Sequence, residues 1–98
     1  WSEMLDWRIG GHDDESVWIE PKNSELVMSP DILFLENPDA KRVKNRLHLD
    51  LRPDNQLVEV ERALSLGARK VDIGQTGEES WVVMADPEGN EFCILKAL

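Results

Sequence analysis

Two short stretches of the sequence place chemically capable side chains at alternate positions. In one stretch a single residue separates His48 from Asp50, and in the other a single residue separates Glu91 from Cys93. Imidazole, carboxylate and thiolate groups form hydrogen bonds and bind transition metals. Because side chains two residues apart share one face of a strand, each stretch predicts a strand with one polar face that could hold a ligand.

The positions between these polar residues are apolar. Leu47, Leu49 and Leu51 alternate with the first pair, and Phe92 and Ile94 alternate with the second. A strand with one apolar and one polar face packs its apolar face on a core. The polar face is then available to line a cavity, and small-molecule pockets combine apolar walls with a few polar groups.

A helix is predicted between the two polar strands, over residues 55–66. Asp54 is a favourable N-cap residue before it, and Gly67 follows it in a typical C-terminal position. Apolar side chains recur at helical spacing along one stripe, at Leu57, Val60, Ala63 and Leu64. This stripe is expected to cover the apolar face of the sheet.

The rest of the second half predicts further strands and a tight turn. Strands are expected at residues 69–73, 81–85 and 91–95. Pro87 and Gly89 predict a reversal between the last two strands, because proline presets the turn backbone and glycine accepts positive φ. Residues 47–98 thus predict a complete βαβββ unit.

Three sequence words in the second half resemble the vicinal oxygen chelate (VOC) superfamily. Within it they resemble the bacterial glyoxalase-like domains, which belong with the bleomycin-resistance and dioxygenase-type domains. The words are Lys-Asn-Arg-Leu-His-Leu-Asp-Leu at 44–51, Leu-Gly-Ala at 66–68 and Asp-Pro-Glu-Gly-Asn-Glu-Phe at 86–92. The resemblance implies an α+β fold of paired βαβββ modules around a central cavity. On this basis residues 1–98 are expected to form one glyoxalase-like domain, with residues 47–98 as its complete second module.

The first half of the chain, residues 1–46, resembles only part of such a module. Residues 1–5 predict the last turn of a helix, and strands are expected at residues 7–9, 17–20 and 32–36. The opening strand and most of the first helix that the resemblance implies are not found, so this module is expected to be incomplete at its N-terminus. The uncovered sheet edge predicts that the chain pairs as a two-fold homodimer instead of remaining a monomer.

The resemblance also implies where a divalent metal would bind, at inward positions of the first and last strands of each module. His48 occupies one such position. The glutamate that glyoxalases place on the last strand falls at Cys93, with Glu91 as a substitute one pleat away. The first module offers only Glu36. Because catalytic metals normally need three protein ligands, the sequence predicts less than one equivalent of metal, with His48 and Glu91 as candidate ligands.

Four tryptophans and no tyrosine form a skewed aromatic set. Trp18 and Trp81 lie on predicted inner strands and are expected to contact a ligand. Trp1 and Trp7 are better explained by packing of helix on sheet, because tryptophan buries a large area. The candidate ligand-binding residues are therefore His48, Asp50, Glu91, Cys93, Trp18 and Trp81.

Composition argues against several classes of function. Twenty acidic against eleven basic side chains give a formal charge of −9, which opposes binding of nucleic acid. The basic cluster at residues 41–46 is interpreted as a solvated connection between modules. No apolar run is long enough for a membrane span, and no nucleotide-binding, nucleophile-elbow or HExxH motif occurs. A single cysteine excludes an intrachain disulfide and favours a reducing, cytoplasmic setting.

Three functions remain open from the sequence. The favoured one is a glyoxalase-like domain that binds a small, partly apolar molecule in a sheet-lined cavity without a full metal site. In this hypothesis His48, Asp50 and Glu91 act as polar anchors. The second is a metal-dependent lyase, isomerase or dioxygenase, for which a divalent metal would be the cofactor. The third is an interaction module that pairs through open sheet edges.

Overall fold

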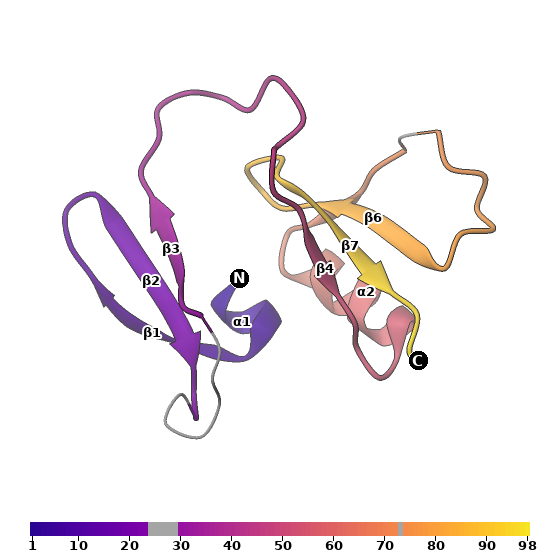
Figure 1. The fold of residues 1–98 in the computed structure, drawn as a ribbon, viewed down its shortest axis with the longest axis horizontal. Helices are drawn as coiled ribbons and strands as arrows, with labels where there is room; N and C mark the ends of the chain where they lie inside the picture. The colour runs from indigo at the N-terminus through magenta and orange to yellow at the C-terminus, as the bar shows by residue number, and fades with distance from the viewer. Residues whose placement is uncertain (24–29, 73) are drawn as a thin grey trace. The chain divides into compact units, whose positions relative to one another are not determined.

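The computed structural model describes residues 1–23, 30–72 and 74–98 of the chain, and these divide into two compact units (Figure 1). The first unit is Trp1–Asp39 and the second is Ala40–Leu98. Each unit has its own sheet, of order β1-β2-β3 in the first and β4-β7-β6-β5 in the second. The predicted α+β class is therefore confirmed. No helix among the described residues is long and apolar enough to cross a membrane.

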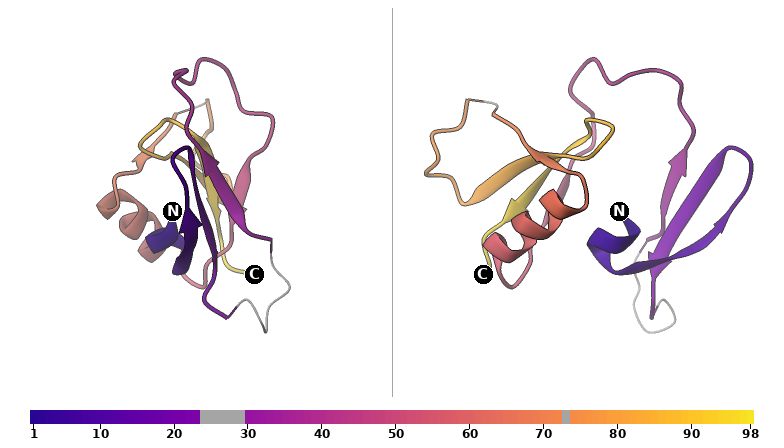
Figure 2. Two further views of the ribbon diagram at one scale, coloured as in Figure 1. Left: turned by 90° about the vertical axis from the view of Figure 1, so that its left-hand side faces the viewer. Right: turned by 180° about the vertical axis from the view of Figure 1, so that it is seen from behind.

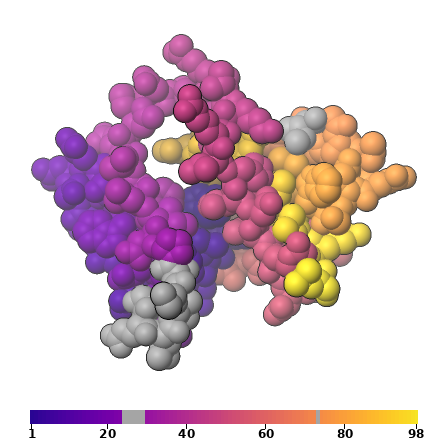
Figure 3. All heavy atoms as spheres, in the orientation of Figure 1, coloured from indigo at the N-terminus to yellow at the C-terminus, as the bar shows by residue number. Residues whose placement is uncertain are grey.

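The second unit has the element order βαβββ. Its elements are β4 (Leu49–Leu51), α2 (Gln56–Ser65), β5 (Arg69–Lys70), β6 (Trp81–Ala85) and β7 (Glu91–Leu95). β5 pairs antiparallel with β6, and β6 pairs antiparallel with β7. β4 pairs parallel with β7. The strands β4 and β7 therefore lie side by side, as Figures 1 and 3 show, although about forty residues separate them in the chain. The chain between β4 and β7 contains the helix α2, in keeping with the long crossover connection that two parallel strands require.

The core of the second unit lies between α2 and one face of the sheet (Figure 2). The side chains of Met84, Phe92 and Ile94 are almost completely buried, as are Val60 and Ala63 on the helix. The parallel register pairs Leu49 with Phe92 and Leu51 with Ile94. The apolar alternation of the two predicted strands therefore does face one side of the sheet.

The predicted apolar stripe of α2 is only partly correct. Val60 and Ala63 are buried, but Leu57 is 75% exposed and Leu64 is 37% exposed. The flanking strands β4 and β5 are only three and two residues long, so the sheet offers the helix a narrow surface. The N-cap is Asn55 and not Asp54, because the Asn55 side chain accepts a hydrogen bond from the Val58 backbone amide at 3.2 Å.

Two strands of the second unit are shorter than predicted. β4 starts at Leu49, and Leu47 before it is 88% exposed. β5 ends at Lys70, although the Val71 amide adds one further hydrogen bond to the Val83 carbonyl. Ile73, at the end of the predicted strand, lies outside the described residues.

The first unit contains one short helix and a three-stranded antiparallel sheet. Its elements are α1 (Ser2–Leu5), β1 (Trp7–His12), β2 (Ser16–Pro21) and β3 (Ile32–Leu35). β1 extends three residues beyond the predicted strand, so Gly10 and Gly11 lie in the strand and not in a loop. The predicted loop that follows β2 falls largely on residues 24–29, which lie outside the described residues.

Trp18 explains why glycines occupy this part of β1. A Cβ atom added at Gly10 or Gly11 would lie 2.5 or 2.4 Å from atoms of the Trp18 ring. The indole therefore packs directly on the glycine backbone, which no other residue type would allow. A bulge in the β1–β2 pairing falls at the same place, between Ile9 and Gly11.

The strand β3 lies at the edge of the first sheet. Among the described residues its pairing partner is β2, and Leu33 and Leu35 are 56% and 67% exposed. In the second sheet the corresponding last strand, β7, is flanked on both sides, by β6 and by β4. The described part of the first unit thus has the order αβββ and lacks a counterpart of β4.

Candidate functional site

The face of the second sheet opposite α2 carries the polar groups that the sequence singled out. The register places Asp50 beside Cys93 and Val83 on the other side of Cys93, so all three share this face. Glu91 and Trp81 share it by alternation along β7 and β6. We call it the polar face and define it by His48, Asp50, Trp81, Glu91 and Cys93.

Three of these residues form one cluster. His48 Nε2 lies 3.2 Å from Cys93 Sγ and 3.5 Å from Asp50 Oδ1. His48 precedes β4, and the parallel pairing of β4 with β7 brings it next to Cys93. The His48 and Asp50 side chains are 33% and 58% exposed, whereas Cys93 is only 8% exposed. The cluster therefore combines a buried cysteine in β7 with two side chains, His48 and Asp50, that solvent can reach.

The environment of Cys93 keeps its thiol protonated. Burial raises the pKa of the Cys93 thiol, and the negative charge of Asp50 raises it further. A thiolate, and not a thiol, is the reactive nucleophile. Cys93 alone is thus a poor nucleophile near neutral pH, and any role as an anionic ligand requires a cation that displaces its proton.

Glu91 has a cationic partner that the sequence did not predict. Lys41 Nζ donates a hydrogen bond to Glu91 Oε1 at 2.8 Å, and both side chains are less than one quarter exposed. This hydrogen bond and the Lys41 charge lower the pKa of Glu91, with smaller contributions from Lys44 and His48. The basic cluster at residues 41–46 was expected to be a solvated connection between modules. Lys41 differs from this expectation, because its side chain is mostly buried and pairs with Glu91. The Glu91 carboxylate is ionised and already paired.

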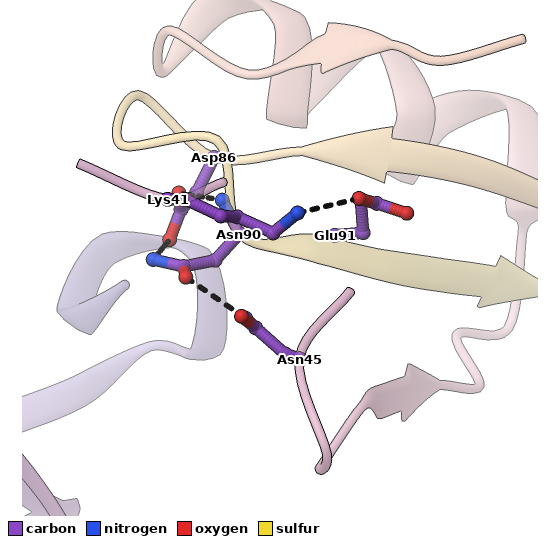
Figure 4. A network of polar contacts seen from close by, with 5 residues as sticks. All are labelled: Lys41, Asn45, Asp86, Asn90 and Glu91. Atoms are coloured by element: carbon purple, nitrogen blue, oxygen red, sulfur yellow. Dashed lines mark hydrogen bonds and ion pairs between the residues drawn. The ribbon is translucent and has the colours of Figure 1, made fainter. Parts of the chain in front are cut away.

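The turn between β6 and β7 positions Glu91 (Figure 4). Asp86 Oδ1 accepts hydrogen bonds from the backbone amides of Glu88 and Asn90 at 3.0 and 2.8 Å. Gly89 has φ of 85°, the left-handed region that the predicted turn required. Asn45 Nδ2 donates to Asn90 Oδ1 at 2.9 Å, so the turn also holds the segment that leads into β4.

Five of the six predicted ligand-binding residues lie on the polar face of the second unit, and the sixth, Trp18, lies in the first unit. His48, Asp50 and Cys93 contact one another, and Glu91 and Trp81 lie on the same face of the same sheet. Trp81 is 42% exposed and offers an accessible aromatic surface. Trp18 belongs to the first unit, where it covers Gly10 and Gly11.

Comparisons with known proteins agree with the fold. The model of a family described as glyoxalase-like domain matches residues 1–95. The crystal structure of a bleomycin resistance determinant encoded on the transposon Tn5 matches with a TM-score of 0.60 and 15% sequence identity. The match covers 98% of this chain and 82% of that chain. No curated protein sequence matches significantly.

Proposed function

Because the chain belongs to the glyoxalase-like domain family of the VOC superfamily, we propose that it binds a small, partly apolar molecule on the polar face of its second sheet. One observation carries the proposal. The sheet has a buried apolar face under α2 and an opposite face on which His48, Asp50 and Trp81 are accessible. A surface with an aromatic side chain and a few convergent polar groups has the composition of a ligand site.

The charges on this face favour a particular kind of ligand. Lys41 neutralises Glu91, so the free negative charge of the face is concentrated at Asp50, whose side chain is 58% exposed. A carboxylate accepts hydrogen bonds and donates none when it is ionised. The expected ligand therefore combines an apolar part that packs on Trp81 with N–H or O–H groups that reach Asp50.

A fragment screen followed by two-dimensional amide NMR tests this function. The probes are small neutral fragments of mixed polarity, together with bleomycin, because the structural relative is a bleomycin resistance determinant. We expect the perturbed amides of bound fragments to cluster around residues 48–50, 81–83 and 91–93. Perturbations scattered over the surface, or no binding by any probe, would contradict the proposal.

Matched variants test which side chains contact the bound fragment. Asp50→Asn and Trp81→Phe should each weaken binding of the best fragment by about tenfold, which corresponds to about 1.4 kcal/mol. Asp54→Asn is the control for the first variant, since Asp54 is an exposed carboxylate outside the polar face. Trp7→Phe in the first unit is the control for the second. Equal effects of variants and controls would place the fragment elsewhere.

A second candidate function, strand pairing with another chain, is favoured by the edge position of β3. Two leucines of this strand, Leu33 and Leu35, are more than half exposed. An edge strand with exposed apolar side chains is a template for pairing with another strand. The oligomeric state of the chain tests this second candidate.

A further inference from the structure

The segment that leads into β4, residues 41–48, contacts the turn between β6 and β7 without forming a helix or strand of its own. We call it the strap. Residues 42–48 are all exposed, and the apolar side chains of Val43 and Leu47 are 76% and 88% exposed. Because these residues bury no side chain in the core, polar contacts hold the strap in place. A segment held in this way opens locally at a lower free energy than the core does.

Two polar contacts fasten the strap to the turn and to the start of β7 (Figure 4). Lys41 Nζ donates a hydrogen bond to Glu91 Oε1 at 2.8 Å. Four residues later, Asn45 Nδ2 donates to Asn90 Oδ1 at 2.9 Å. The first contact is an ion pair that is mostly buried, and the second is a hydrogen bond between two amides.

The direction of the second contact is fixed by Asp86. One carboxylate oxygen of Asp86, Oδ2, accepts a hydrogen bond from Asn90 Nδ2 at 3.2 Å. A carboxylate has no proton to donate, so Asn90 must turn its NH₂ group toward Asp86 and its carbonyl oxygen toward the strap. Only a hydrogen-bond donor can bind that oxygen, and the Asn45 side chain supplies the donor. Asp86 therefore specifies, through Asn90, which group the strap must present.

The strap ends at His48, three residues after Asn45. His48 Nε2 lies 3.2 Å from Cys93 Sγ on the polar face. We propose that the Asp86–Asn90–Asn45 relay is a directional latch that holds the strap closed and thereby positions His48 against Cys93. Asn45 is thus a positioning residue, since it acts on the polar face through His48. Release of the latch moves His48 away and uncovers the Cys93 thiol.

Strap closure also bears on ligand binding, and this effect rests on the proposed function. His48 is one of the accessible polar groups of the polar face, so the closed strap completes the ligand site. A ligand that contacts His48 binds the closed form more tightly than the open form. Closure and ligand binding therefore strengthen each other by the same factor.

Alkylation of Cys93 by iodoacetamide, followed by mass spectrometry of the full chain, measures strap opening. Cys93 is the single cysteine of the sequence and is 8% exposed. Opening of the strap exposes little surface, whereas global unfolding exposes much, so the two respond differently to urea. We expect the alkylation rate of wild type to stay constant at low urea concentration. A rate that rises with urea in parallel with global unfolding would overturn the proposal.

Asn45→Asp tests the polarity of the latch. The variant places an acceptor against the Asn90 oxygen, so it should open the strap and speed alkylation by about fivefold, as expected for one lost hydrogen bond. Its added negative charge would by itself raise the thiol pKa and slow the reaction, so acceleration identifies opening. Asn55→Asp is the control, because the Asn55 side chain acts as an acceptor at the N-cap of α2 and a carboxylate preserves this role. Alkylation of Asn45→Asp at the wild-type rate would overturn the proposal.

A second substitution should rescue this variant. Asp86→Asn presents an NH₂ group to Asn90, whose amide then turns over and offers its own NH₂ group to the strap. Added to Asn45→Asp, it should return the alkylation rate to within about twofold of wild type, because a hydrogen bond forms again. General loss of structure would not be rescued in this way. Failure of the rescue, in a double variant that folds, would overturn the relay.

The ion pair provides a test that does not depend on folding of the Asp86 variant. Lys41→Met keeps the length of the side chain and removes its charge, so it should also speed alkylation severalfold at low urea. Lys70→Met, at an exposed position on β5, is the control and should leave the rate unchanged. Equal rates in Lys41→Met and wild type would show that the strap is not held at this point and would overturn the proposal.

The fragment screen separates the strap from the proposed function. If both hold, Asn45→Asp should speed alkylation and weaken fragment binding. Faster alkylation in a chain that binds no fragment would support the strap and contradict the proposed function. Fragment binding on the polar face, with alkylation equal in Asn45→Asp and wild type, would support the proposed function and overturn the strap.

Discussion

At the scale of single residues, the acidic groups of the polar face differ in how their charge is balanced. Glu91 is paired with Lys41 and is less than one quarter exposed. Asp50 is more exposed and has His48 as a neighbour at 3.5 Å. Because a carboxylate already paired with a lysine gains little from a second cation, Asp50 is the better candidate for contact with a ligand or metal.

The Lys41–Glu91 pair predicts a pH-dependent contribution to stability. The pKa of Glu91 is lowered in the folded chain, so the pair stabilises fully above the ordinary glutamate pKa of about 4.3 and is lost as pH falls through the lower folded value. Glu91→Gln should therefore lower the free energy of unfolding near neutral pH. The difference from wild type should shrink as pH falls from about 6 to about 3. Denaturant unfolding across this range checks it.

The control for this measurement is Glu88→Gln, on the same turn. Glu88 is exposed, and its side chain has no ion pair among the described residues. Its replacement should leave stability nearly unchanged at every pH. A pH dependence of equal size in both variants would mean that the net charge of the chain, and not the pair, is responsible.

The packing of Trp18 on the β1 glycines predicts a large effect of one methyl group. A Cβ at Gly11 would lie 2.4 Å from the indole, so Gly11→Ala should cost about 1–3 kcal/mol of unfolding free energy as an overpacking change. Thermal or denaturant unfolding measures the loss. In a Trp18→Ala background the same substitution should cost much less, since the contact is gone. An equal cost in both backgrounds would show that the backbone, and not the indole, excludes alanine.

At the scale of elements, α2 shows which part of its sequence holds the second unit together. Val60 is 3% exposed and Val58, two residues earlier, is 59% exposed. Val60→Ala should lower the free energy of unfolding by about 2 kcal/mol, from lost burial plus a small cavity. Val58→Ala removes the same atoms from an exposed position and should change stability by less than about 0.5 kcal/mol. Denaturant unfolding of both variants decides whether the helix face is correctly assigned.

The same helix shows what the sequence could and could not predict. Periodicity predicted α2 and its apolar stripe, but not that Leu57 and Leu64 would be exposed, because burial depends on the width of the sheet beneath. Alternation predicted that Glu91 and Cys93 share a face. It could not predict the Lys41–Glu91 pair, whose members are 50 residues apart, or the proximity of Asp50 to Cys93, which depends on the β4–β7 register.

At the scale of the whole molecule, the two units differ in the protection of their sheet edges. In the second unit β4 covers one side of the last strand, β7. In the described part of the first unit the last strand, β3, pairs with β2 on one side only, and its Leu35 is 67% exposed. A small domain has little stability in reserve, so an apolar edge of this kind favours association.

We therefore predict that the chain of residues 1–98 forms a two-fold homodimer in which the β3 edges of two copies pair. A two-fold axis lets each edge protect the other, which is the commonest form of closed association. Light scattering at micromolar concentration should give twice the mass of one chain. Leu35→Lys should shift the chain to monomer, because a charged side chain on an edge strand opposes pairing. Leu57→Lys, at a 75% exposed position on α2, is the control and should leave the dimer intact. A well-folded wild-type monomer would contradict this prediction, and a dimer lost equally in both variants would place the interface elsewhere.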